Sequence, residues 1–163
     1  MLVKKMSMTL ALAALLTFID GEAQDRPARQ RLTPAEIDSG SSAGAGAGTS
    51  GVSGIQTILL KGDPTKPGLY TILIRVPANT RIEAHDHPDD RVATVTSGTW
   101  YFGYGDRFDE HELKALTPGS FYTEPPNEPH FARTGDAPVT VQISGFGPTG
   151  TRYRDHAADP RTH

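Results

Sequence analysis

The chain has 163 residues, a length that predicts about one domain. Its formal net charge is -3, with 16 Lys and Arg against 19 Asp and Glu, which excludes the basic surface of a nucleic-acid-binding protein. The absence of Cys excludes disulfides, thiolate metal sites and a Cys nucleophile. With 17 Gly and 13 Pro the chain is rich in turns, which argues against a helix bundle.

Residues 1–23 have the pattern of a secretory signal peptide. Lys4 and Lys5 form a positive start, an apolar run extends from Met8 to Ile19, and Gly21-Glu22-Ala23 supplies small residues before a cleavage site. The run is too short to cross a bilayer, which needs about 20 residues. We therefore expect a periplasmic or secreted mature chain that begins at Gln24 and does not contact the membrane. The three Met lie before that cut, so the mature chain lacks sulfur and must hold any metal through nitrogen or oxygen.

Residues 24–51 are expected to form a flexible segment. Thr33, Pro34 and Glu36 fit a single helical turn with a capping box. The stretch from Ser39 to Ser53 is mostly Gly, Ser and Ala, which bury too little surface to offset the entropy lost on ordering. At the other end, residues 148–163 are predicted to be a polar, frayed C-terminal tail.

Short strands separated by turns are predicted from Gly54 onward. Tyr70, Ile72, Ile74 and Val76 form a clean period-two face. About eight or nine such strands within residues 52–147, without a long helix, predict an all-β sandwich or barrel. The clearest runs are 55–59, 70–76, 91–96, 99–105, 113–116, 120–124, 130–133 and 139–143.

Three histidines are candidate metal ligands. His85 and His87 are separated by one residue, and alternate side chains of a strand point to the same face. His130 follows a proline-rich turn at the start of another predicted strand. Imidazole is the commonest metal ligand, and three histidines with open positions form a catalytic type of site. A lone His-X-His pair also occurs on surfaces without a function, so the fold must bring His130 near the pair.

These residues resemble the two motifs of the cupin family. His85-X-His87 and Gly98 fall at the spacing of the first motif, and Gly119, Pro125 and His130 at that of the second, with Asn127 in the place of its second glycine. The resemblance covers about Val52 to Gly147. It implies a double-stranded β-helix, or jelly-roll barrel, in a single domain, with a metal held inside by His85, His87 and His130.

The chain departs from the family at the usual fourth ligand, a Glu, because Arg91 holds that position. Arginine is cationic and cannot ligate a metal. Three alternatives remain open: a three-His site completed by water, which we favour; a carboxylate from Asp89 or Asp90; or Glu124 reaching in from a neighbouring strand. Thr134 also replaces a family Asn, at a position expected to be structural.

The predicted function is that of an exported metal-binding cupin, with one divalent first-row metal (Fe, Zn, Ni, Cu or Mn). We expect a metalloenzyme of oxygenase or oxidoreductase type that acts on a small molecule, with Glu124, Tyr122 and Arg91 as candidate catalytic residues. The alternative is a non-catalytic periplasmic protein that binds or senses a metal or small ligand. A homodimer is left open.

Overall fold

The structure is a computed structural model that describes residues 29–162. The predicted signal peptide, residues 1–23, and the predicted N-terminus at Gln24 lie outside the described residues. The chain divides after Arg31 into two units, and every element named below belongs to the second, Leu32–His163.

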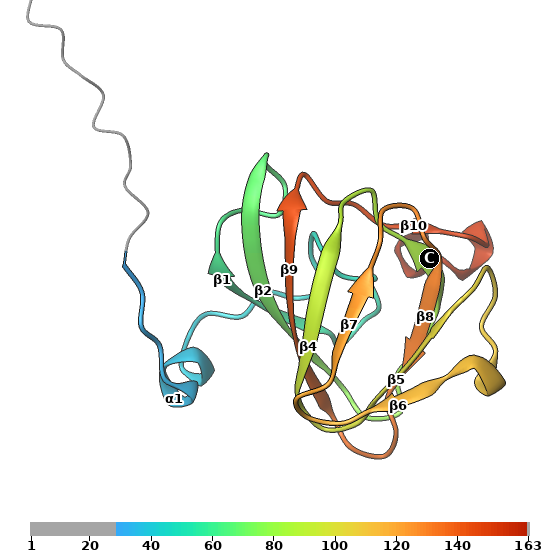
Figure 1. Ribbon diagram of the computed structural model, residues 1–163, viewed down its shortest axis with the longest axis horizontal. Coiled ribbons are helices and arrows are strands. Elements are labelled where there is room, and N and C mark those ends of the chain that lie inside the picture. Colours follow the sequence, from blue (N-terminus) through green and yellow to red (C-terminus); the bar gives the residue numbers. More distant parts are fainter. Residues whose placement is uncertain (1–28, 163) are drawn as a thin grey trace, which may run out of the picture. The chain divides into compact units, whose positions relative to one another are not determined.

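Two five-stranded sheets make up the fold (Figure 1). The first has the order β1-β2-β9-β4-β7 and the second the order β10-β3-β8-β5-β6, and all pairings are antiparallel. The prediction of an all-β jelly-roll class is therefore confirmed. The strands are β1 (Gln56–Lys61), β2 (Gly68–Val76), β3 (Arg81–Asp86), β4 (Arg91–Ser97), β5 (Trp100–Tyr104), β6 (Lys114–Leu116), β7 (Phe121–Glu124), β8 (His130–Arg133), β9 (Val139–Gly147) and β10 (Arg152–Tyr153).

Helices are short in the described residues. The helix α1 (Pro34–Asp38) begins at the predicted capping box, in which the Thr33 side chain accepts from the Glu36 N–H and the Glu36 side chain accepts from the Thr33 N–H. Three 3₁₀ turns follow: η1 (Glu110–Glu112), η2 (His156–Ala158) and η3 (Pro160–Thr162). None of the described helices is both long and apolar enough to cross a membrane.

Alternation along the strands places the apolar core between the two sheets. The predicted face of β2, Tyr70, Ile72, Ile74 and Val76, is buried throughout. Residues of the facing strands pack against it, so that both sheets exclude water from one continuous core. The other core members are Ile55, Ile82, Ala93, Val95, Trp100, Phe102, Leu116, Tyr122, Ala132, Val139, Val141 and Ile143.

The turn between β4 and β5 requires glycine. Gly98 has a φ of 74°, in the left-handed region, and a Cβ there would lie 2.4 Å from the Pro138 carbonyl oxygen. This tight reversal sends the chain from the first sheet to the second, and it thereby sets where Trp100 and Phe102 enter the core.

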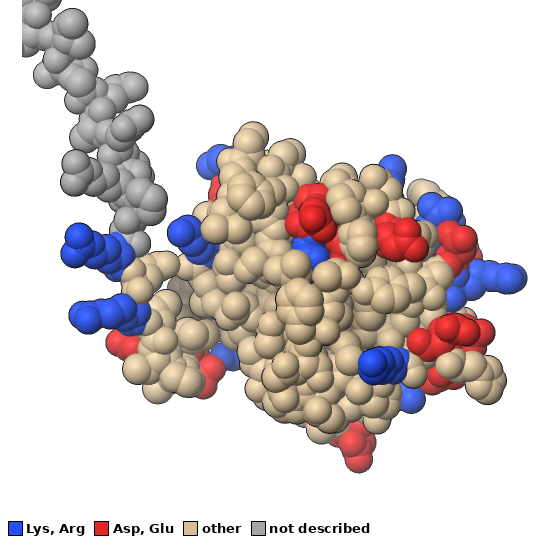
Figure 2. Space-filling model, in the orientation of Figure 1, with Lys and Arg blue, Asp and Glu red and all other residues tan. Residues whose placement is uncertain are grey.

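The outer face of the first sheet is nearly free of charge. Figure 2 shows few charged side chains over β9, β4 and β7, and the charged groups lie around the rim. Val92, Phe121 and Phe146 are exposed on these three strands, and Leu69 is exposed on the neighbouring β2. Scattered apolar side chains are normal on a protein surface, and a homodimer stays a prediction.

The Gly/Ser/Ala-rich segment packs on the sheets, although its composition suggested a flexible linker. Ala43 and Thr57 exchange two backbone hydrogen bonds of 2.8 Å, and Thr49 and Ser50 are buried. The contacts that hold it come from the predicted C-terminal tail. Thr151 Oγ1 donates to the Thr49 carbonyl, and Tyr153 Oη donates to the Ser50 carbonyl.

Candidate metal centre

The pairing of β3 with β8 and the residue that follows β3 place the three histidines close together. His85 of β3 and His130 of β8 are register partners in an antiparallel pair, with ring centroids 4.5 Å apart. His87 follows directly after β3, and its backbone carbonyl accepts from the Asn127 N–H at 2.7 Å. All three side chains are buried, and their ligand atoms lie within 4.8 Å of one another.

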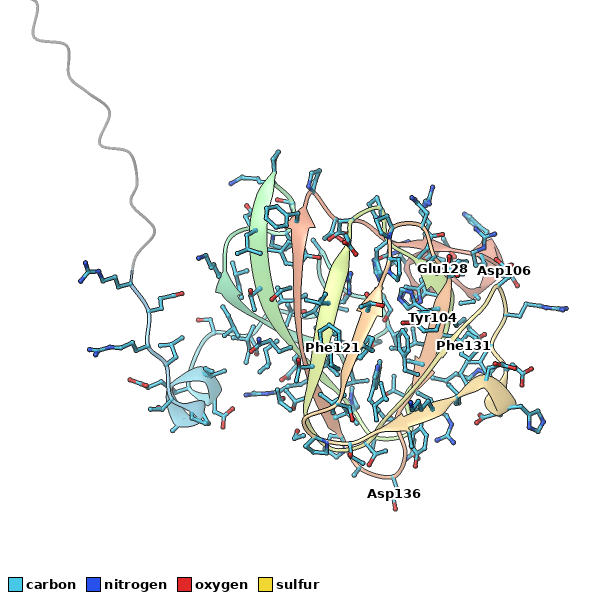
Figure 3. The ribbon with its side chains drawn as sticks, viewed as in Figure 1. Tyr104, Asp106, Phe121, Glu128, Phe131 and Asp136 are labelled. Carbon is cyan, nitrogen blue, oxygen red and sulfur yellow. The ribbon has the colours of Figure 1, made fainter. Side chains whose placement is uncertain are left out.

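Asn127 explains how the loop between β7 and β8 reaches His87. It has a φ of 60°, a left-handed conformation that asparagine tolerates better than most residues, and it stands where the family motif has glycine. Its side-chain oxygen accepts from Arg152 Nη2. The loop is thus fixed against both β10 and His87, at the end of the molecule where Glu128 lies and opposite the end of Asp136 (Figure 3).

The backbone orients each imidazole in the same way. Nδ1 of His85 lies 2.8 Å from the Glu83 carbonyl oxygen, Nδ1 of His87 lies 2.6 Å from that of Gly150, and Nδ1 of His130 lies 3.1 Å from that of Glu128. A carbonyl only accepts, so each Nδ1 carries the proton and each Nε2 keeps a free lone pair. The three histidines, whose ligand atoms lie within 4.8 Å of one another, can therefore offer their lone pairs to one metal ion.

Burial keeps these imidazoles neutral. Loss of water lowers the pKa of His85 to about 3, with a further contribution from His130. Burial and the nearby Arg91 guanidinium lower the pKa of His130 to about 3 and that of His87 well below its usual range. Neutral imidazole is the form that ligates metals, so the trio needs no deprotonation near neutral pH.

Glu124 is the carboxylate that lies beside the histidines. It is the last residue of β7 and is buried, and its Oε2 lies 3.7 Å from Nε2 of His87 and 3.7 Å from Nε2 of His130. The Arg91 side chain lies 2.8 Å away, measured from Nε to the same Oε2, but the N–H is not aimed at the oxygen and neither atom has a hydrogen bond. A buried carboxylate oxygen without a hydrogen bond, close to two imidazoles, matches the place of a fourth ligand.

The other carboxylates considered as ligands point elsewhere. Asp89 is buried, but its Oδ2 accepts from Tyr70 Oη at 2.7 Å and its Oδ1 accepts from Thr149 Oγ1. Asp90 is exposed. The geometry therefore favours Glu124 as the carboxylate of the site, although the sequence favoured water.

Aromatic side chains form the inner wall of the site. The Phe102 ring stacks on His130 at a centroid distance of 5.4 Å and packs on Tyr122 at 4.3 Å. Burial raises the pKa of Tyr122 well above its usual range, so its phenol stays protonated. Trp100 is buried deeper along β5, whereas Tyr104 is exposed and donates to the Thr123 carbonyl, which links β5 to β7 (Figure 3). The side chains at 100, 102 and 122 are pocket wall and core.

The site opens into a small cavity of about 30 Å³, called the chamber below. Gly48, Thr49 and Ser50 line it together with the three histidines, Arg91 and Glu124. On the outer side, the Tyr153 ring stacks on His85 at 5.3 Å. Sequence reasoning missed both segments, because residues 48–50 and 153 lie in stretches that look unstructured by composition.

Taken together, the residues fit a divalent first-row metal ion. Three neutral imidazole nitrogens and one carboxylate are ligands that Fe, Zn, Ni, Cu and Mn all accept. Glu124 Oε2 gives this fit an independent observation: it is buried without a hydrogen bond, and its ion-pair contact with Arg91 Nε at 2.8 Å leaves lone pairs that a metal ion could use.

Solved structures share this fold at low sequence identity. The chain matches the polyketide cyclase RemF from Streptomyces resistomycificus with a TM-score of 0.61 and 16% identity, over 82% of this chain and 90% of that one. It matches an RmlC-like cupin from Shewanella frigidimarina with a TM-score of 0.50 and 17% identity, over 67% and 85%. It matches the DMSP lyase DddQ from Ruegeria pomeroyi with a TM-score of 0.51 and 22% identity, over 60% and 50%.

The chain has the cupin fold, as its motifs predicted. The chain spans 65%, 50% and 60% of the lengths of three of the matched structures. No protein-family model matches the sequence, and no curated protein matches it. The likeness therefore establishes the fold, while activity has to be argued from the site.

Proposed function

We propose that this protein is a metal-dependent enzyme for a small molecule, with His85, His87, His130 and Glu124 as the ligands of one divalent first-row metal. One observation carries the proposal: three buried histidines have ligand atoms within 4.8 Å of one another, beside a carboxylate oxygen that has no hydrogen bond. The cupin neighbours include proteins named as a lyase and a cyclase, so the fold accommodates enzymes. The chemistry that we infer is oxidation of a small molecule by O₂, for which a redox-active first-row metal would supply a Lewis-acidic centre that also passes electrons.

The chain's own residues have distinct parts in this proposal. The imidazoles are held in the ligating tautomer by backbone carbonyls before any ion arrives. Arg91 keeps a permanent positive charge at the chamber. Tyr122 holds a phenolic proton next to Glu124, and the shielded aromatic wall excludes water from the reacting region.

A non-catalytic binding or sensor protein is the second candidate. The observation in its favour is the size of the chamber, about 30 Å³, because a substrate needs more room than that. Export to the periplasm or medium belongs to both proposals, and it depends on residues 1–23 alone.

Elemental analysis of untagged protein purified from the native host tests the metal centre. We expect about one equivalent of a first-row metal, lost in His85→Ala and retained in His111→Ala, whose imidazole is exposed. Protein free of metal under every growth condition would refute the proposal. Oxygen consumption by the iron-loaded protein with catechols, thiols and 1,3-diketones then separates the two functions, since turnover abolished in His130→Ala identifies an enzyme.

A further inference from the structure

The chamber contains buried polar groups that no protein atom satisfies. Arg91 is 2% exposed, yet its Nη1 has no hydrogen-bond partner. Ser50 Oγ is buried and also lacks one. Both residues line the cavity beside the histidines. Because a buried donor without an acceptor costs free energy, these two groups indicate a ligand with acceptor atoms.

The charge balance indicates that this ligand is an anion. Among the described residues that line the cavity, Arg91 and Glu124 are the only members of the Lys, Arg, Asp and Glu classes, and the two form an ion pair, so their charges compensate each other. A divalent cation, which the proposed function requires, adds positive charge that no lining residue offsets. A water molecule satisfies donors but leaves this charge uncompensated.

We propose that the chamber is a subsite for the carboxylate group of a small organic acid, bound through Arg91 Nη1 and Ser50 Oγ. This inference rests on the proposed metal centre and names the ligand class for it. A carboxylate presents several lone pairs to donors on two sides, and arginine is suited to such groups. The two donors that the carboxylate would accept from belong to β4 and to the segment 48–50.

The dimensions of the chamber set the size of the acid. A volume of about 30 Å³ is roughly that of one water molecule in the liquid, so even a carboxylate group has to push the chamber walls apart. Gly48, Thr49 and Ser50 wall the chamber, and the rest of a larger acid would have to displace them. We therefore expect acetate to bind more tightly than benzoate.

The single tryptophan of the chain allows carboxylate binding in the chamber to be tested without an activity assay. Trp100 lines the same cavity, so its fluorescence reports on the occupant. Zinc-loaded full-length protein in chloride-free buffer is titrated with acetate, benzoate and inorganic phosphate, by fluorescence and by calorimetry. We expect saturable binding of one acetate, a weaker signal with benzoate, and acetate affinity reduced about tenfold or more in Arg91→Met.

Two further variants keep the test decisive if Arg91→Met does not fold. Arg91→Lys retains the positive charge but lacks the forked N–H donors of the guanidinium. Ser50→Ala removes one hydroxyl donor. Each change should weaken acetate binding a few-fold. Arg133→Met is the matched control, because Arg133 stacks on the Tyr101 ring outside the cavity and should leave acetate binding unchanged.

The outcomes separate this inference from the proposed function. Zinc bound at one equivalent without saturable acetate binding overturns the carboxylate subsite and leaves the metal centre standing. Equal acetate affinity in the wild type and all three site variants overturns it as well, as does phosphate binding more tightly than acetate. Failure to bind zinc refutes the proposed function itself.

Discussion

Arg91 and Glu124 are register partners across β4 and β7, so the two side chains meet inside the chamber. In the family motif the carboxylate ligand stands at the position of Arg91, on β4. Here that position carries the cation, and the carboxylate stands on the adjacent strand. The pairing moves the negative charge by one strand while keeping it next to His87 and His130.

Replacing Glu124 by Gln should weaken metal binding at least about tenfold, because the amide lacks the negative charge. The metal-free variant should also lose about 3–5 kcal/mol of stability, since Arg91 is left buried without a counter-charge. Zinc calorimetry and urea denaturation measure the two effects. Glu128→Gln is the control, because only the backbone carbonyl of Glu128 contacts the site. Unchanged zinc affinity in Glu124→Gln would exclude this carboxylate as a ligand.

Exchanging Arg91 and Glu124 should restore the zinc affinity that Glu124→Arg alone destroys. Glu124→Arg places two guanidinium groups together and should abolish zinc binding. Adding Arg91→Glu returns a carboxylate to the motif position and re-forms the ion pair, so the double variant should recover most of the lost affinity. A full double-mutant cycle by calorimetry measures this coupling. Additive losses would show that the two residues act independently.

Metal-free protein should lose stability as the pH falls below about 6.5. The folded chain holds His85 and His130 neutral with a pKa of about 3, whereas the unfolded chain takes up protons near 6.5. Acid therefore favours the unfolded state between these values, by about 1.4 kcal/mol per pH unit for each histidine. Urea denaturation at several pH values should show a smaller slope in His130→Gln and the wild-type slope in His111→Gln. A flat profile between pH 6.5 and 5 would contradict the buried neutral histidines.

Gly145→Ala should destabilise the fold without changing the metal content. A Cβ at this position would lie 2.7 Å from both Asp89 Oδ2 and Tyr70 Oη, so it would break their buried hydrogen bond. We expect a loss of about 1–3 kcal/mol in thermal or urea denaturation. Gly135→Ala is the control, since its added Cβ would meet only an ordinary contact with the Tyr101 ring. Wild-type stability in Gly145→Ala would mean that Asp89 and Tyr70 move apart at no cost.

Sequence reasoning reached the strands and the histidines because both depend on local signals. Alternation along residues 70–76 and the spacing of His85 and His87 are visible in one dimension. The position of Glu124 was only one of three alternatives, since its choice depends on the register between β4 and β7, which no local pattern encodes.

Sequence reasoning did not predict order in the segments around the chamber, the Gly/Ser/Ala-rich segment and the C-terminal stretch, for a different reason. Composition suggests flexibility for residues 24–51, but Thr151 and Tyr153, about one hundred positions away, donate hydrogen bonds to two carbonyls of this segment. Those donors lie in the stretch expected to fray, where Arg152 also binds the buried Asp86. Each segment looks unstructured alone because its partners come from the other.

The carbonyls that hold the three imidazoles belong to the main chain of Glu83, Glu128 and Gly150. Their identity as acceptors is independent of the side chains at those positions, two of which are exposed or half-buried glutamates. Natural variants could therefore change these three residues freely and still inherit a correctly oriented ligand trio. A search for related centres by their polar supporting residues would overlook such proteins, whereas a search on backbone geometry would find them.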